Sequence, residues 1–281
     1  MLGASRLPGR LTRLSCAAAF LCVVSGPGTA HAGSIGFRVD TDVDTRDGLS
    51  VKVTLTQTGD EAANDVTPTI EFLGKQTTGE PIAKFQPSQD HVWEIRLRDQ
   101  PLTPGSYAVV VRVRYSDANG YPFEITSLAP ATPGGKAGAR VSGAFVIPKV
   151  PVDGDADGTL SLKKPKGRSG PFEGVLISPH GLHLTPEHFP VDFDQEGNAS
   201  IDLSLNNDKL LAGTSVNVFA LVSSDQDGFH QTDTVRGTIH IVAAESLLSG
   251  TTFYRAAAAA AALLVVLELI GALRRRTRGM K

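Results

Sequence analysis

The chain has 281 residues, a formal net charge of −2 and 41% hydrophobic residues. The charge is unevenly spread, because residues 33–254 hold 18 of the 27 Lys and Arg but 28 of the 29 Asp and Glu, a net charge of −10. A surface of that sign repels phosphate backbones, so nucleic acid is excluded as an expected partner.

The first 32 residues have the pattern of a secretory signal peptide. Three arginines precede an apolar run over residues 14–24, and residues 30–32 form the small-x-small cleavage site Ala-His-Ala. We therefore expect residues 1–32 to be removed. Both cysteines, Cys16 and Cys22, would leave with them, so the mature chain would form no disulfide. A secreted chain without disulfides points to a bacterial envelope protein.

Several segments after the signal alternate apolar and polar residues with a period of two, which predicts half-buried antiparallel strands. Examples are "LSVKVTLTQ" from Leu49, "HVWEIRL" from His91 and "SYAVVVRVRY" from Ser106, where Arg112 and Arg114 should face outward. Turn residues separate these segments at the intervals of a β-sandwich. The residues expected to face the core are Leu49, Val51, Val53, Leu55, Trp93, Ile95, Leu97, Tyr107, Val109, Val111, Val113 and Tyr115.

An internal repeat indicates two domains of one kind. "LTPGSYAVVVRVRYSDANGY" begins at Leu102 and "LLAGTSVNVFALVSSDQDGF" at Leu210, an ungapped offset of 108 residues. A spacing near 100 residues suits one immunoglobulin-like domain. The repeated segment should be a final hairpin, in which a long strand, a D-x-[ND]-G turn and a return strand follow one another. We therefore predict an all-β fold: two tandem immunoglobulin-like β-sandwiches, followed by one C-terminal transmembrane helix.

The segment "LTPGSY" resembles the corner of fibronectin-type and related bacterial sandwiches. Together with "VRYSDANGYPF" it resembles bacterial cell-surface modules of the CARDB and NEW3 type. The resemblance covers about 20 residues in each copy. It implies an adhesion-like or scaffolding fold and no catalytic residues, with Tyr107 as a corner tyrosine whose hydroxyl bonds nearby backbone. The second copy has Ser215 at that position.

The repeat sets the expected domain boundaries. The first sandwich should span residues 33–147 and the second residues 159–242, with 148–158 as a linker stiffened by prolines and bent by Gly and Asp. A Pro- and Gly-rich stretch, residues 127–140, makes the first copy about 14 residues longer than the second. A stretch of this kind is either a disordered decoration or a binding loop at the tip of the sandwich.

The linker carries a candidate calcium site. Asp153, Asp155 and Asp157, with Gly158 after them, match the opening of an EF-hand loop, whereas the twelfth position is Lys164 in place of a glutamate. We interpret the segment as a polar linker that calcium can stiffen but that needs no cofactor. The three aspartates remain the candidate metal ligands. A weaker version of the same pattern is "DTDVDTRDG", from Asp40 to Gly48.

A second cluster of metal-binding residue types lies in "SPHGLHLTPEHF". It contains His180, His183, Glu187 and His188, but Pro179 and Pro186 prevent the helix that would align them on one face. We read this segment as an edge strand and loop. Since no nucleophile elbow, phosphate loop or paired-carboxylate signature is present, we expect a protein that is not an enzyme. A metallohydrolase at this cluster is one alternative.

The C-terminal region has the pattern of a membrane anchor. Residues 243–255 would be a juxtamembrane segment, 256–273 a transmembrane helix and 274–281 a basic cytoplasmic tail. The helix contains one charge, Glu268, which either leans toward the headgroups or contacts a partner helix. The positive tail places the C-terminus in the cytoplasm and the body outside.

These features favour a single-pass protein of the bacterial inner membrane, with a non-catalytic ectodomain that is periplasmic or extracellular. It would serve adhesion, scaffolding or accessory binding, with a protein or polysaccharide of the envelope as its partner. The main alternative is a calcium-dependent carbohydrate-binding module. The single tryptophan, Trp93, weakens that alternative because its predicted position faces the core rather than a sugar.

Overall fold

The computed structural model describes residues 33–46, 48–97, 102–134 and 138–243. Every helix or strand in these ranges is a β-strand, which confirms the all-β prediction. Within the same ranges no helix is long and apolar enough to cross a membrane. The predicted signal peptide, juxtamembrane segment and transmembrane helix, with Glu268 and the basic tail, lie outside the described residues.

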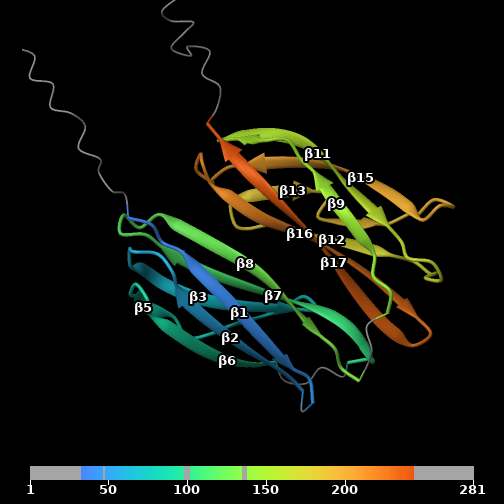
Figure 1. The fold of residues 1–281 in the computed structure, drawn as a ribbon, viewed down its shortest axis with the longest axis horizontal. Helices are drawn as coiled ribbons and strands as arrows, with labels where there is room; N and C mark the ends of the chain where they lie inside the picture. The colour runs from blue at the N-terminus through green and yellow to red at the C-terminus, as the bar shows by residue number, and fades with distance from the viewer. Residues whose placement is uncertain (1–32, 47, 98–101, 135–137, 244–281) are drawn as a thin grey trace, which may run out of the picture. The chain divides into compact units, whose positions relative to one another are not determined.

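The strands form two consecutive groups in the chain, shown in Figure 1 from blue to green and from green to orange. The first group is β1 (Phe37–Asp44), β2 (Leu49–Gln57), β3 (Ala63–Phe72), β4 (Lys75–Thr78), β5 (Ile82–Phe85), β6 (Asp90–Leu97), β7 (Gly105–Ser116) and β8 (Pro122–Ala131). The second group is β9 (Ser142–Val146), β10 (Val150–Pro151), β11 (Gly154–Lys163), β12 (Glu173–Ile177), β13 (Leu182–Thr185), β14 (His188–Pro190), β15 (Asn198–Asn207), β16 (Ser215–Gln226) and β17 (Phe229–Val242).

Three sheets arise from these strands. A three-stranded sheet has the order β1-β2-β6, and a four-stranded sheet has the order β13-β15-β11-β9. A ten-stranded sheet has the order β14-β12-β16-β17-β7-β3-β4, with β5, β8 and β10 paired to it beside this path. The ten-stranded sheet therefore contains strands of both groups and joins them.

Two separate hydrophobic cores lie between the sheets, in a β-sandwich-like arrangement. The first core packs β2 and β6 against β3 and β7, and the second packs β11 and β15 against β12, β16 and β17. Eleven of the twelve residues predicted to face the core are buried, and Tyr115 is half-buried against the first core. Trp93, 5% exposed, belongs to this core as expected.

Both repeated segments form the predicted hairpins. β16 and β17 are joined by Asp227 and Gly228, whose φ angles of 53° and 76° lie in the left-handed region that such two-residue turns require. β7 and β8 are joined by a turn in which the Gly120 amide donates to the Asp117 carbonyl at 3.1 Å. The D-x-[ND]-G pattern therefore marks a hairpin turn in both copies.

The expected linker, residues 148–158, contains strand β10 and the first half of strand β11. β11 pairs with β15 along its whole length, and with β9 from Thr159 to Lys163. The pattern Asp-x-Asp-x has a period of two, so it also suits a strand, and here Asp155 and Asp157 are exposed while Ala156 and Gly158 between them are half-buried. The correction is that strand alternation, rather than a hinge, explains the spaced aspartates.

The boundary between the two groups lies earlier than the sequence suggested. Residues 127–131, expected in a loop, are the last part of β8, and β9, expected in the first domain, pairs with β11 in the four-stranded sheet. The strand equivalent to β17 is β8. The described residues 132–134 and 138–141 lie between β8 and β9, and residues 135–137 are outside the described part.

The two groups meet where β7 and β17 pair in parallel, Gly105 with His230 and Ser106 with Gln231. A Cβ atom at Gly105 would lie 2.0 Å from the His230 carbonyl oxygen, so the close approach of the two strands requires glycine. Beyond this pairing a small apolar cluster of Val110, Ile177 and Phe219 fills the space between the groups.

Candidate functional site

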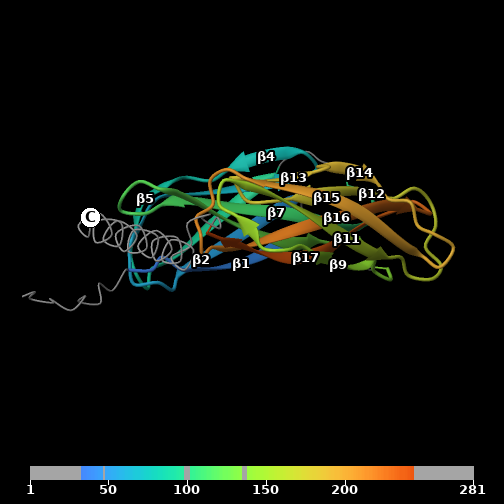
Figure 2. The same cartoon turned by 90° about the horizontal axis from the view of Figure 1, so that it is seen from above.

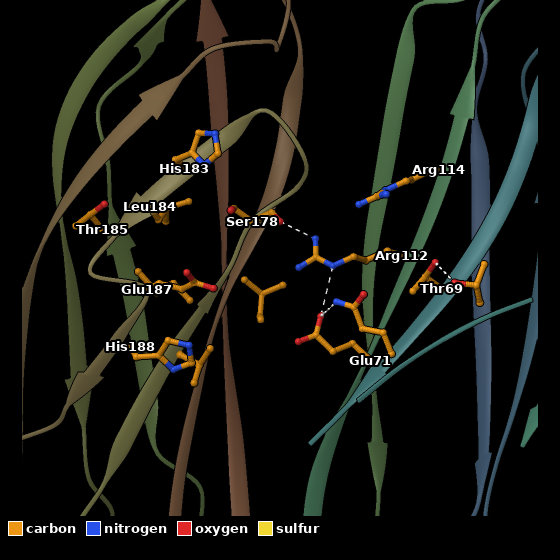
Figure 3. Close-up of a pocket in the computed structure, with 15 residues that line it drawn as sticks. Thr69, Glu71, Arg112, Arg114, Ser178, His183, Leu184, Thr185, Glu187 and His188 are labelled. Carbon is orange, nitrogen blue, oxygen red and sulfur yellow. Dashed lines mark hydrogen bonds and ion pairs between the residues drawn. The ribbon is translucent and has the colours of Figure 1, made fainter. Parts of the chain in front are cut away.

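A cleft of about 730 Å³ opens between the first and second groups, and we call it the β7–β12 cleft (Figure 3). Strands β3, β4 and β7 form one side, and the segment from β12 to β14 forms the other. Figure 2 labels the strands β4, β7, β12, β13 and β14. Its lining residues are Thr69, Glu71, Gln76, Thr78, Arg112, Arg114, Val175, Leu176, Ile177, Ser178, His183, Leu184, Thr185, Glu187 and His188.

The strand periodicity explains how polar residues reach this cleft. Thr69 and Glu71 of β3, like Arg112 and Arg114 of β7, are alternate residues on the face opposite the first core. The sequence predicted that the arginines face outward, but not that the second group faces them. One residue in the sequence could have indicated this contact. Val110 is an apolar residue on the outward face of β7 that carries Arg112 and Arg114, and it is buried against Ile177 and Phe219 of the second group.

Arg112 lies at the centre of the cleft and contacts both groups. Its Nη1 donates to Glu124 Oε1 at 2.7 Å. The same Nη1 donates to the Ser178 carbonyl at 2.7 Å, and its Nε lies 3.8 Å from Glu71 Oε2 (Figure 3). Arg114 donates from Nε to the other oxygen of Glu124 at 2.9 Å. The two arginines thus share one carboxylate, and Arg112 fixes the β12–β13 connection against β7.

The carboxyl group of Glu124 is only 1% exposed. Burial raises its pKa, but the hydrogen bonds and charges of Arg114 and Arg112 outweigh burial and hold that pKa below the ordinary value. Glu124 therefore stays ionised at neutral pH and acts as the structural counter-charge of the two arginines. A general acid would need the opposite shift.

The histidine-rich segment supplies the other wall, but its candidate ligands do not converge. His183 Nε2 lies 3.6 Å from Asp208 Oδ2, whereas His180 Nε2 lies 3.2 Å from Lys209 Nζ outside the cleft. Glu187 and His188 line the cleft without an ion pair to another described residue. In the described ranges no group of three or more His, Cys, Asp or Glu is placed to hold a metal ion.

The aspartates proposed as calcium ligands are likewise not part of any group of three or more His, Cys, Asp or Glu that could hold a metal ion among the described residues. Asp153 lies in the turn before β11 with φ at 50°, Asp155 Oδ1 accepts a hydrogen bond from Asn206 Nδ2 at 2.7 Å, and Asp157 is opposite Ser204. The weaker aspartate pattern, from Asp40 to Gly48, begins within β1. Asp44, the last residue of β1, pairs with Arg46. That contact lowers the pKa of Asp44 to about 2. Asp47 is outside the described residues.

Tyr107 confirms the bond implied for a corner tyrosine. Its hydroxyl donates to the Thr103 carbonyl at 3.0 Å, and the Thr103 hydroxyl lies at the same distance. The ring stacks on His230 with centroids 4.3 Å apart. His230, which the sequence did not single out, in turn lies 2.8 Å from Asp225 Oδ1 and 2.9 Å from the Thr232 hydroxyl. Tyr107 therefore also supports the place where β7 and β17 pair, because its ring stacks on His230 of β17.

No family model matches this chain, and no curated protein matches it. Among solved structures, red sea bream transglutaminase is 14% identical over 73% of this chain, with a TM-score of 0.25. The α2-macroglobulin of E. coli is 9% identical over 75%, with a TM-score of 0.30. A protein of unknown function from Porphyromonas gingivalis W83 is 8% identical over 72%, with a TM-score of 0.27. The chain spans 31%, 17% and 98% of these structures, respectively. At such scores the similarities carry no argument about fold or function.

Proposed function

We propose that this chain is a non-catalytic binding protein of the bacterial envelope, with two tandem immunoglobulin-like sandwiches that act by contact. In this role it serves adhesion, scaffolding or accessory binding, and its partner is a protein or polysaccharide that enters the β7–β12 cleft. The observation that supports this proposal most is the cleft itself, whose walls come from both strand groups and carry mainly polar side chains. Ligands bind preferentially in concave sites, and a polar lining suits a partner that is recognised by hydrogen bonds and charge.

The charged side chains of the cleft support binding rather than chemistry. Arg112 and Arg114 are engaged by Glu124, which is held ionised, and Arg112 also contacts Ser178. Groups fixed in this way present a preorganised surface to a ligand, because little side-chain freedom is left to lose on binding. A catalytic acid or base instead needs a pKa close to the working pH.

The cellular setting is part of the same proposal. Cleavage after residue 32, one span over residues 256–273 and a basic cytoplasmic tail place the ectodomain in the periplasm or outside the cell. A partner helix at Glu268 fits this setting, because ionisable residues within membranes commonly have a partner. Protease added to intact spheroplasts should remove the ectodomain and spare the tail. Removal of the tail alone would contradict this orientation.

Site-specific photo-crosslinking in living cells tests the binding role. A photoreactive phenylalanine analogue at Thr78, inside the cleft, should form a discrete adduct, whereas the same analogue at the exposed Lys163 on the four-stranded sheet should not. Thr185→Trp, which fills the cleft, should suppress the adduct at Thr78. The proposal fails if both positions form the same adducts, or if filling the cleft changes nothing.

A further inference from the structure

A second cleft lies on the other side of the junction, and we call it the β8 cleft. It has a volume of about 560 Å³ and is bordered by β1, β7 and β8 of the first group and by β16 and β17 of the second. β8 pairs with β7 and has β16 near it (Figure 1). The side chains that matter are Arg38, Arg140, Arg236, Asn217, Ser127, Thr232, Thr234 and Asp233.

Three arginines from separate parts of the chain meet in this cleft, and all three are exposed. Arg140 forms no ion pair or hydrogen bond with any residue that the structure describes. Arg236 donates from Nε and Nη2 to Asn217 Oδ1, at 3.1 and 2.9 Å, which leaves its charge unpaired. Arg38 pairs with Asp40 at 2.9 Å, but both side chains are well exposed, so solvent weakens that pair.

The acidic residue of the cleft does not offset these charges. Asp233 is 3% exposed and is already paired with Arg168 from outside the lining. It also accepts the Val141 amide at 2.9 Å and the Gln231 side-chain amide at 2.9 Å. With Asp233 and Asp40 each matched by an arginine, Arg140 and Arg236 remain as two uncompensated positive charges. Such a site is unexpected in an ectodomain whose net charge is −10.

We infer that the β8 cleft binds an anionic polysaccharide that carries carboxylate groups. Arginine guanidinium groups match carboxylates in geometry and charge and can pair with them through two hydrogen bonds. The hydroxyl groups of Ser127 and Thr234 line the same cleft and can exchange hydrogen bonds with sugar hydroxyls, whereas the Thr232 hydroxyl is already engaged by His230 and Ser223. The inference rests on the proposed binding role but uses a different cleft, so each can fail without the other.

The overall charge of the protein sets a condition on this interaction. At low ionic strength the acidic ectodomain repels a polyanion over long range, whereas in 0.1 M salt charges beyond about 10 Å are largely screened. Direct contacts between arginine and carboxylate persist at that salt. Binding should therefore be measurable near 0.1 M salt and decline as the salt concentration rises toward 1 M, where the screening length falls to about 3 Å.

The experiment measures binding of fluorescent polygalacturonate to the full chain purified in detergent, with neutral dextran as the polymer control. Arg140→Gln and Arg236→Gln should each weaken binding about tenfold, the loss expected for one charge-assisted contact. The matched controls are the single variants Lys52→Gln and Lys163→Gln, each of which removes one positive charge from an exposed position on another sheet face. Each control should leave binding unchanged.

Each outcome decides the inference. Binding of polygalacturonate but not dextran, weakened about tenfold in each arginine variant and unchanged in the lysine controls, supports it. Absence of polygalacturonate binding overturns it, as does equal binding by the arginine variants. Equally tight binding of polyglutamate or polyphosphate would overturn the assignment to a glycan and leave a general anion site. The crosslink from Thr78 reports on the β7–β12 cleft alone, so it separates failure here from failure of the proposed function.

Discussion

The buried ion pair of Arg168 and Asp233 gives the sharpest stability prediction. The two side chains are 9% and 2% exposed. Arg168 also donates to the Ser224 hydroxyl, and its guanidinium carbon lies 5.1 Å from the centre of the Phe172 ring. Asp233 also accepts a hydrogen bond from the backbone amide of Val141 at 2.9 Å, so the pair holds the chain in place just before β9.

Arg168→Ala leaves the Asp233 carboxylate buried without its counter-charge. Removing one partner of a buried pair costs about 3–5 kcal/mol, which is a large part of the roughly 5–15 kcal/mol that stabilises a typical domain. Urea unfolding of the full chain, followed by far-ultraviolet circular dichroism, measures the loss. The fluorescence of Trp93 in the first core shows whether that group unfolds in the same transition.

Arg38→Ala is the matched control, since its pair with Asp40 is 66% and 60% exposed. That variant should change stability by less than about 1 kcal/mol. A double-mutant cycle with Asp233→Ala separates the pairing energy from the cost of the lost side chains. If Arg168→Ala is as stable as Arg38→Ala, then the Arg168–Asp233 pair is not a buried ion pair that stabilises the fold.

Four further outcomes follow from individual contacts. Gly105→Ala should destabilise the fold more than Gly213→Ala, the substitution at the equivalent position of the second repeat. A Cβ atom at Gly105 would meet backbone atoms of His230, whereas a Cβ atom at Gly213 would meet nothing within 4 Å. Melting temperatures of the two variants compare these losses. The pKa of Glu124 is depressed, so its stabilisation is complete above the ordinary value of 4.5 and is lost as the pH falls through the folded pKa. Glu124→Gln should flatten this acid limb in unfolding curves taken between pH 3 and 6. Tyr107→Phe should cost about 1 kcal/mol in urea unfolding, the net value of one hydrogen bond. Calorimetry should show calcium binding no tighter than about 10⁻⁴ M, and sub-micromolar binding lost in Asp155→Ala would restore the calcium loop.

Period-two patterns predicted much of the fold, because one face of each half-buried strand must be apolar. The residues from Leu49 to Leu55 and from Trp93 to Leu97 are buried as that rule requires. The same rule explains why residues 148–158 were predicted to be a linker. Spaced aspartates from Asp153 to Asp157 suit a polar linker and a strand equally, and the pairing of β11 with β15 shows that the segment from Gly154 is a strand.

The candidate clefts were not predictable from the pattern of any one segment. The β7–β12 cleft needs β7 and β12 to meet, and the β8 cleft brings Arg38, Arg140 and Arg236 together from positions far apart in the chain. Long-range contacts of this kind depend on how the two groups dock. Periodicity places Arg112 and Arg114 on an outward face but does not indicate which outward faces become opposed. Arg140 lies between β8 and β9, where strand periodicity does not apply.

Both clefts depend on the two strand groups being held together by the β7–β17 pairing, and pulsed electron spin resonance tests this directly. The predicted mature chain has no cysteine, so spin labels attach cleanly to Gln76→Cys and His188→Cys, which line the β7–β12 cleft from opposite groups. A pair within the first group, Lys52→Cys and Lys84→Cys, gives the reference. We expect an interspin distance distribution across the cleft as narrow as that of the reference pair. A broad distribution, several times wider than the reference, would show that the groups move independently and would contradict a fixed pairing of β7 with β17.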